Sequence, residues 1–361
     1  MRSGATEVRD EHGLVAEVDR VRAGEAAPER LVEVLHEDAA VHRGHSTGAT
    51  ARVRGWVLAA FAEVGLPAAA LPFVREELES GIEPYPVAGA ARALRGGSAD
   101  ADVQDLLARA FVNLRTRDEP LSFDLLQPVW PAGSTTSALR EILATAAWLT
   151  HGAPDRWQAV LDESNGLDPS LRDALARLAS AAPTCCHGAP EPTADVTPDG
   201  SLAALTDLAV EDSTGETSTL GALTLGRPTV LTFFYTRCDN PNKCTLTIRK
   251  LGELQQRLGD AHILALTYDP GYDTPPRLAR YAQDRGLHPA AGTTVGRLPG
   301  GNAAIEAALH LRVGHGGATV NRHAVQVFLL DAGGAVVAIW QRRDWDVGEV
   351  AAAATAATPT R

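Results

Sequence analysis

The chain has 361 residues, which is long for a single hydrophobic core and predicts two domains of ordinary size. Apolar residues make up 45% of the sequence and charged residues 22%, a composition that excludes a wholly disordered protein. The formal net charge of −12 argues against a nucleic-acid-binding surface, which needs a basic stripe.

The N-terminal segment, MRSGATEVRDEHGLVAEVDR, lacks the run of apolar residues that forms the core of a signal peptide. No segment approaches the roughly 20 consecutive apolar residues that span a bilayer as a helix. We therefore expect a chain with no membrane span and a cytoplasmic location.

Residues 27–181 are predicted to form consecutive amphipathic helices. The segment ARVRGWVLAAFAEVG has apolar residues at helical spacing, namely Val53, Trp56, Val57, Ala60, Phe61 and Val64. Gly65 and Pro67 then predict the end of this helix, and Asp168-Pro169 predicts the start of a later one. Paired short helices with tight breaks indicate an all-α, HEAT-like helical-repeat domain over residues 1–181, although no clean repeat period is visible.

Residues 182–200 form a predicted linker. Their sequence, APTCCHGAPEPTADVTPDG, is rich in proline and has no helical or strand periodicity. The linker carries the adjacent Cys185, Cys186 and His187.

Residues 201–361 are predicted to form an α/β domain. The apolar runs at 227–235 and 261–268 are typical of buried strands, and each precedes a helical pattern, at 244–259 and 274–286 respectively. Residues 323–341 are predicted to form a hairpin with its turn at Asp331 to Gly334, followed by a last helix at 346–357. This order of elements is the thioredoxin arrangement.

All four cysteines follow residue 184. They are Cys185, Cys186, Cys238 and Cys244. In a reducing compartment such clustering indicates metal binding or catalysis more often than a structural disulfide framework.

Three stretches, TVLTFFYTRCDNPNKC, LTYDPGYDTPPRLARYAQDRG and NRHAVQVFLLDAGGAVV, resemble the signature segments of the Sco/SenC family, in the same order. The resemblance covers roughly residues 200–355 and implies a thioredoxin-like, copper-binding domain. It places the copper ligands at Cys238, Cys244 and His323, and the acidic residue of the middle motif at Asp269, with Asp273 in the D-T-P sequence that follows. The family usually has three residues between its two cysteines, whereas five lie between them in this chain.

The implied ligands fit the chemistry of copper. Thiolates are soft donors and imidazole is borderline, so two cysteines and a histidine favour Cu(I) and can also hold Cu(II). Cys244 lies at the start of a predicted helix, with Arg237 and Lys243 nearby in sequence, so we expect its thiol pKa to be lowered.

Two further groups have several interpretations. Cys185, Cys186 and His187 could form a mobile arm that donates or accepts metal, supply a resolving thiol, or be an unimportant linker sequence. His315, in a glycine-rich loop, could be an additional ligand, a neighbour of the ligands or an ordinary loop histidine.

The preferred hypothesis is a metallochaperone-like protein that passes copper or reducing equivalents to a partner protein, with the helical domain as a docking scaffold. One alternative is a thiol–disulfide oxidoreductase or peroxidase-like enzyme with Cys238 and Cys244 as catalytic residues. Another is a copper-dependent oxidative enzyme whose larger site includes Cys185, Cys186 and His187. A further alternative is an interaction protein whose redox domain has decayed. The sequence identifies neither the partner nor the oligomeric state.

Overall fold

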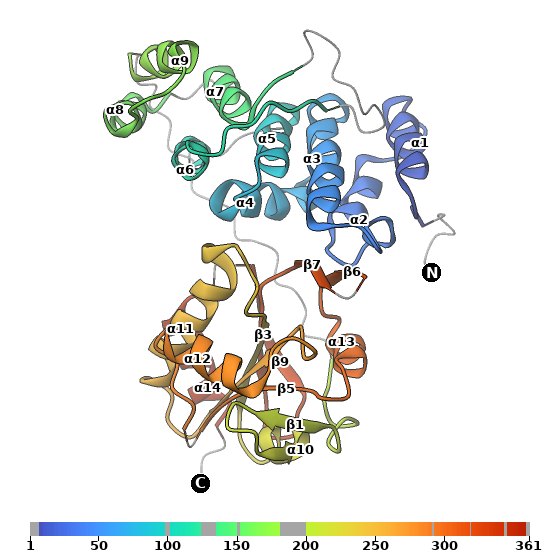
Figure 1. Ribbon diagram of the computed structural model, residues 1–361. Coiled ribbons are helices and arrows are strands. Elements are labelled where there is room, and N and C mark those ends of the chain that lie inside the picture. Colours follow the sequence, from blue (N-terminus) through green and yellow to red (C-terminus); the bar gives the residue numbers. More distant parts are fainter. Residues whose placement is uncertain are drawn as a thin grey trace. The chain divides into compact units, whose positions relative to one another are not determined.

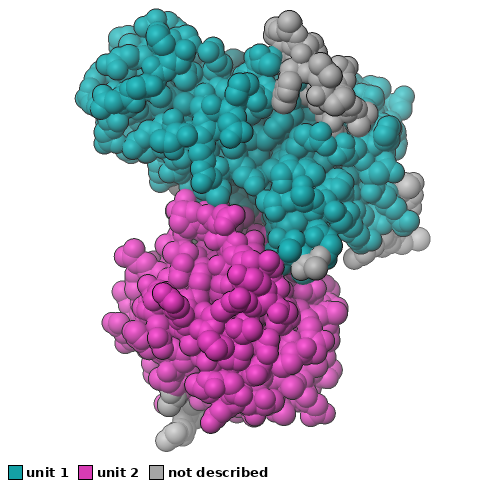
Figure 2. Space-filling view, in the orientation of Figure 1, with its two compact units in different colours: residues 1–192, 314–322 teal, residues 193–313, 323–361 magenta. Residues whose placement is uncertain are grey.

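The structure is a computed structural model that describes residues 7–97, 102–123, 135–149, 152–180, 200–290, 292–317, 319–342 and 345–358. The chain divides into two compact units, shown in different colours in Figure 2. Unit 1 comprises Met1–Pro192 together with Gly314–Arg322, and unit 2 comprises Thr193–Val313 together with His323–Arg361. A short piece from the C-terminal half of the sequence is therefore part of the N-terminal unit.

Unit 1 is built from α-helices, as the sequence predicts (Figure 1). They are α1 (Glu11–Arg22), α2 (Val32–Leu35), α3 (Thr47–Val64), α4 (Leu71–Ser80), α5 (Pro84–Ala93), α6 (Val103–Leu114), α7 (Ala138–Trp148), α8 (Pro154–Glu163) and α9 (Pro169–Ala179). The Ser46 side chain caps α3 by accepting a hydrogen bond from the amide of Ala49, and Gly65 ends the helix with a φ of 93°. An all-α N-terminal part is thus confirmed, while its HEAT-like character stays a prediction.

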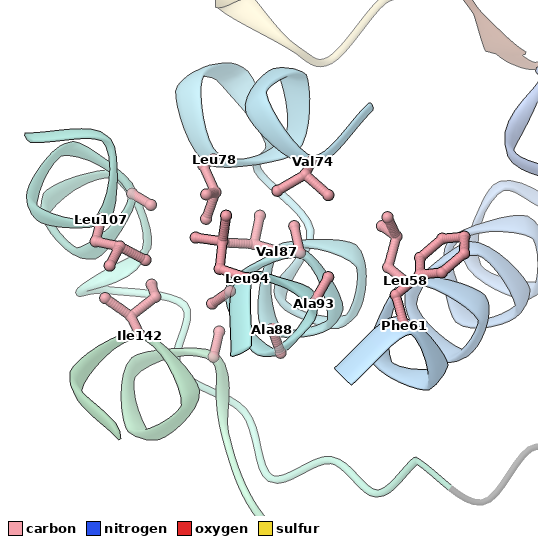
Figure 3. Close-up of a cluster of buried hydrophobic side chains, with 14 of the residues drawn as sticks. Leu58, Phe61, Val74, Leu78, Val87, Ala88, Ala93, Leu94, Leu107 and Ile142 are labelled. Carbon is pink, nitrogen blue, oxygen red and sulfur yellow. The ribbon is translucent and has the colours of Figure 1, made fainter. Parts of the chain in front are cut away.

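The core of unit 1 is centred on α5, as Figure 3 shows. Buried side chains from neighbouring helices surround it, among them Phe61 of α3, Leu78 of α4, Leu107 of α6 and Ile142 of α7. Helices α3 and α5 approach closely at a pair of glycines, since a Cβ atom on Gly89 would lie 2.2 Å from the carbonyl oxygen of Gly55. Small residues at this crossing explain how an alanine-rich sequence still packs densely.

Unit 2 contains a seven-stranded mixed sheet in the order β2-β1-β5-β4-β3-β8-β9. Its strands are β1 (Ala209–Asp212), β2 (Thr217–Thr219), β3 (Thr229–Phe234), β4 (His262–Thr267), β5 (Thr293–Arg297), β8 (Gln326–Leu330) and β9 (Val336–Gln341). Its helices are α10 (Leu220–Thr224), α11 (Leu246–Gln255), α12 (Pro275–Gln283), α13 (Ala303–Leu309) and α14 (Val347–Ala356). The remaining strands, β6 (Val313–Gly316) and β7 (Thr319–His323), form a separate two-stranded sheet. Most of their residues belong to unit 1.

Strand β3 lies at the centre of the domain. It runs parallel to β4 and antiparallel to β8, and all of its residues are buried. One sheet face, including Val230 of β3, packs against apolar residues of α11, α12 and α14, which Figure 1 shows beside the sheet. A central parallel strand pair with an antiparallel hairpin and covering helices is a thioredoxin-like fold, so the predicted fold class is confirmed.

Besides β6 and β7, three strands of the seven-stranded sheet add to the order expected from the sequence. They are β1, β2 and β5, which have 4, 3 and 5 residues respectively. Each is too short to give a clear period-2 pattern, and β5 is also interrupted by Gly296. Within the described part of the chain, no helix is both long enough and apolar enough to cross a membrane.

Candidate metal centre

Three segments that are distant in sequence bring Cys238, Cys244 and His323 together. Cys238 follows β3, Cys244 lies in a π-helical turn (Pro241–Thr245) that precedes α11, and His323 is the last residue of β7. The Nε2 atom of His323 lies 3.4 Å from Sγ of Cys238 and 3.4 Å from Sγ of Cys244. All three ligand atoms lie within 4.8 Å of one another, and no other group of this kind occurs among the described residues.

The backbone fixes which nitrogen of His323 faces the sulfurs. Its Nδ1 atom lies 3.0 Å from the carbonyl oxygen of Ala324. Because a carbonyl can only accept a hydrogen bond, Nδ1 carries the proton and donates it. In the neutral ring, Nε2 is then the unprotonated nitrogen and presents its lone pair to Cys238 and Cys244.

The pKa values of the two thiols are shifted in opposite directions. A hydrogen bond from the Cys244 thiol, together with the neighbouring His323, stabilises the thiolate of Cys238 and holds its pKa well below the ordinary value, against the effect of burial. Burial raises the pKa of Cys244, which is 1% exposed, and the neighbouring Cys238 raises it further. The expectation of a lowered pKa at Cys244 is therefore wrong, because desolvation outweighs the helix terminus and the charge of Lys243.

Aromatic rings enclose the histidine. The ring of Tyr235 meets His323 edge-on with centroids 5.3 Å apart, and the ring of Tyr268 lies at the same distance, tilted by 38°. The Tyr268 hydroxyl also donates to the carbonyl of Ala324 at 3.3 Å. Lys243 is buried, and its Nζ donates to the carbonyl of His323 at 3.2 Å. These contacts fix both the ring and the backbone of the candidate ligand.

Neither tyrosine was expected at the site from sequence. Tyr235 directly follows β3 and Tyr268 directly follows β4, so both stand at the carboxyl ends of parallel strands. That position is where open α/β sheets gather functional side chains, and it was the signal available in the sequence.

The acidic residues of the middle motif lie beside the ligands rather than among them. Asp269 pairs with the guanidinium of Arg237. Asp273 is fully buried and accepts hydrogen bonds from the backbone amide of Thr236 and from the hydroxyls of Thr236 and Thr267. Both carboxylates thus hold the segment between β3 and Cys238.

The accessory residues do not join the group in the described structure. His315 is exposed, lies on β6 and belongs to unit 1, where its carbonyl accepts a hydrogen bond from the amide of Gly44. Cys185, Cys186 and His187 lie outside the described residues. Their role stays a prediction.

The donor set suits one soft metal ion. Two ligands held by one tetrahedral ion at bond lengths of about 2.0–2.3 Å lie roughly 3.5 Å apart. The separations between Nε2 of His323 and the two sulfurs match this value. Two sulfur donors and one imidazole leave a coordination position open, which distinguishes the group from a closed structural zinc site.

Residues 207–358 match the family model described as SCO1/SenC, which confirms the resemblance of this domain. Among solved structures, ScoI of Bradyrhizobium japonicum with copper bound is 18% identical, covering 45% of this chain and 99% of that chain, with a TM-score of 0.35. ScoI of Arabidopsis thaliana with copper bound is 16% identical, covering 42% of this chain and 94% of that chain, with a TM-score of 0.35. BsSco, a member of the Sco family of cytochrome c oxidase assembly proteins with a disulfide switch, is 17% identical, covering 46% of this chain and 96% of that chain, with a TM-score of 0.36. No curated protein matches the chain.

Proposed function

We propose that this chain, whose residues 207–358 form a thioredoxin-like domain of the SCO1/SenC family, binds copper through Cys238, Cys244 and His323 and passes copper or electrons to a partner protein. The observation that carries the proposal is the position of Nε2 of His323, 3.4 Å from each of the two sulfurs. Copper is the cargo in this function, and the three side chains are its carrier.

The pKa values of the two cysteine ligands are suited to binding a soft cation. Cys238 has a lowered pKa and supplies a thiolate near neutral pH. Cys244 has a raised pKa and loses its proton when the metal replaces it, so binding releases a proton. Two thiolates and an imidazole stabilise Cu(I), and the nitrogen donor also accommodates Cu(II).

Differences in burial support transfer to a partner. Cys238 is half-buried, whereas Cys244 and His323 are buried. A partner's thiol or imidazole therefore reaches a metal on the Cys238 side first, and exchanges with that ligand while the buried pair still holds the ion. Stepwise ligand exchange of this kind moves Cu(I) without releasing it to water.

Copper titration of the full-length protein tests the proposal. The reduced wild-type protein is expected to bind one Cu(I) against a chromogenic Cu(I) chelator, with weaker binding in Cys238→Ser and His323→Ala. His288→Ala is the matched control, because His288 follows α12 and is not part of the ligand group. Copper binding that is equal in all four proteins would refute the assignment of the ligands.

A second candidate, a thiol–disulfide oxidoreductase, is favoured by the opposite acidities of the two thiols. The thiolate of Cys238 would attack a disulfide of the partner to form a mixed disulfide. Cys244 would then lose its proton and attack Cys238, leaving a Cys238–Cys244 disulfide and a partner with two thiols. Turnover of a disulfide substrate with metal-free protein, abolished in Cys244→Ser, would favour this function over copper transfer.

A further inference from the structure

We infer that Tyr272 is a positioning residue for the copper ligand Cys238 and acts through the guanidinium of Arg237. Tyr272 lies in the loop of residues 268–274 between β4 and α12, and Arg237 directly precedes Cys238 in the chain. All of these residues belong to unit 2, so the inference depends on the internal structure of that unit alone. It rests on the proposed copper site and adds to it a residue from outside the group of ligands.

The aromatic ring of Tyr272 contacts two guanidinium groups. The Cζ atom of Arg237 lies 4.1 Å from the ring centroid, and the Cζ atom of Arg277, in α12, lies 4.0 Å from it. A cation over the face of an aromatic ring is attracted by the ring electrons, and a guanidinium also stacks on the ring because it is planar. Tyr272 is 37% exposed, so these contacts account for a large aromatic side chain at the surface.

The backbone of Tyr272 is fixed, so its ring is a firm support for the guanidinium that stacks on it. The amide of Tyr272 donates to the carbonyl of Asp269 at 3.1 Å, and its own carbonyl accepts from the guanidinium of Arg277 at 2.6 Å. The carbonyl of Pro270 accepts a further hydrogen bond, at 2.9 Å, from Arg297 of β5. The loop is therefore held both to the helix that follows it and to the sheet.

The side chain of Arg237 is held at two points. Its guanidinium donates to the carboxylate of Asp269 and lies over the ring of Tyr272. A long side chain with a single ion pair at the protein surface keeps much of its freedom, because such pairs are weak. The second contact, with a flat ring, restricts the plane of the guanidinium as well. Together the two contacts fix the position and the orientation of the group.

The immobilised Arg237 restrains the backbone on the N-terminal side of Cys238. The preceding residue, Thr236, donates its amide to the buried carboxylate of Asp273 at 3.1 Å, so the anchors of residues 236 and 237 all lie on one loop. On the other side of Cys238, five residues lead to Cys244, and a longer connection restrains its ends less than a shorter one does. The position of Cys238 is therefore restrained chiefly from its N-terminal side.

This restraint favours metal binding. A ligand that is already ordered loses less conformational freedom when a metal binds than a mobile one does, so its affinity is higher. Without the ring of Tyr272, Arg237 keeps only its contact with Asp269, and the segment before Cys238 gains freedom that copper must remove again. The difference is present in the metal-free protein and disappears once Cu(I) orders the segment.

Variants of the full-length protein test the inference. Tyr272→Ala removes the ring, whereas Tyr272→Phe keeps the ring face that the guanidinium contacts. Arg237→Lys keeps the positive charge but removes the planar group. Leu225→Ala is the matched control, because it truncates a side chain of similar exposure, 40%, that precedes β3 at the end of the strand opposite to Cys238.

Cu(I) affinity and hydrogen exchange are measured on each variant. Cu(I) affinity from chelator competition is expected to fall about 3- to 10-fold in Tyr272→Ala and in Arg237→Lys, and to stay within about twofold of wild type in Tyr272→Phe and Leu225→Ala. The double variant Arg237→Lys/Tyr272→Ala should lie within about twofold of either single variant, because both changes break one contact. Exchange across residues 236–239 of the metal-free protein should be faster in Tyr272→Ala but not in Tyr272→Phe, and Cu(I) should remove the difference.

The outcomes separate the two proposals. A purely structural role of Tyr272 would lower the urea midpoint and leave the Cu(I) affinity of the folded protein unchanged, and that result would overturn the inference. Equal weakening in Tyr272→Ala and Tyr272→Phe, or additive effects in the double variant, would overturn it as well. None of these results affects the proposed function if the wild type binds Cu(I) through its three ligands, whereas a wild type that binds no copper would refute both. If Tyr272→Ala fails to fold, Arg237→Lys decides the question, since wild-type affinity in that variant contradicts the inference.

Discussion

The Sγ atom of Cys238 lies 3.4 Å from Nε2 of His323, although 85 residues separate them in the chain. The pairing of β3 with β8 explains this proximity. Thr232 near the end of β3 lies opposite Val327 near the start of β8, and the strands run antiparallel. The residues that follow β3 and those that precede β8 therefore reach the same edge of the sheet.

The two thiols are expected to differ sharply in reactivity. Cys238 is half-buried with a lowered pKa, whereas Cys244 is buried with a raised one. Iodoacetamide should therefore label Cys238 before Cys244 in reduced, metal-free protein. The labelling rate of Cys238 should stay high below pH 7, whereas the labelling rate of an ordinary thiol falls tenfold for each pH unit. Peptide mass spectrometry after timed labelling at pH 5 to 8 measures this.

A variant of His323 measures the contribution of this histidine to the reactivity of Cys238. His323→Gln should raise the pKa of Cys238, since a group that stabilises its thiolate is lost, and should slow labelling at pH 5 to 6. Equal labelling of Cys238 and Cys244 in the wild type would contradict the opposite acidities of the two thiols.

Replacing Asp273 is expected to destabilise the thioredoxin-like unit. This fully buried carboxylate accepts hydrogen bonds from Thr236 and Thr267, and Asp273→Ala leaves those donors without a partner. The expected loss is about 3 kcal/mol in the free energy of unfolding. Asp284→Asn, at an exposed position after α12, is the control and should change stability by less than about 0.5 kcal/mol. Urea unfolding measures both.

The stability of unit 1 is expected to fall in mild acid because of His42. Burial, with the charge of Arg54, lowers its pKa from 6.5 to about 4 in the folded chain. Between these pH values the unfolded chain binds a proton that the folded chain does not, so stability decreases as the pH falls from 6.5 to 4. The total effect is about 3 kcal/mol, and His42 contributes none of it above pH 6.5.

A variant and the other unit provide the controls for this prediction. His42→Gln should flatten the pH dependence in unit 1, where Nε2 of His42 donates to the carbonyl of Val34. Unit 2 should keep its own acid dependence, because burial likewise lowers the pKa of His262 to about 4. Urea unfolding with pulsed hydrogen exchange, read on peptides from α3 and from β4, follows each unit separately.

The crossing of α3 and α5 is expected not to tolerate a methyl group. In Gly89→Ala the new Cβ atom would lie 2.2 Å from the carbonyl oxygen of Gly55, so the helices must separate. We expect a loss of about 2–3 kcal/mol from overpacking. Gly48→Ala, in the first turn of α3 with no atom within 4 Å of its Cβ position, should be neutral or stabilising. Thermal unfolding that is equally affected in both variants would contradict the close approach.

Patterns of apolar residues were enough to predict the main elements. The helical stripe from Val53 to Val64 lies within α3, and the continuous apolar run before Cys238 forms β3, which is buried on both faces. Strong periodicity and long buried runs are local properties, so the sequence reveals them directly. The three ordered motifs also indicated Cys238, Cys244 and His323, which the fold brings together.

Other properties depend on the surroundings that folding creates. The sequence favoured Cys244 as the acidic thiol, but its pKa is raised by desolvation, which no local pattern reports. Likewise, nothing in residues 314–322 predicts that they pack within the helical unit, because Arg322 and Glu77 are 245 positions apart and meet only in the folded chain. The sequence by itself determined the order of the main elements and the three candidate ligands. The tertiary structure decided which thiol is ionised and which unit holds the segment before His323, because burial and long-range charge pairing exist only after the chain has folded.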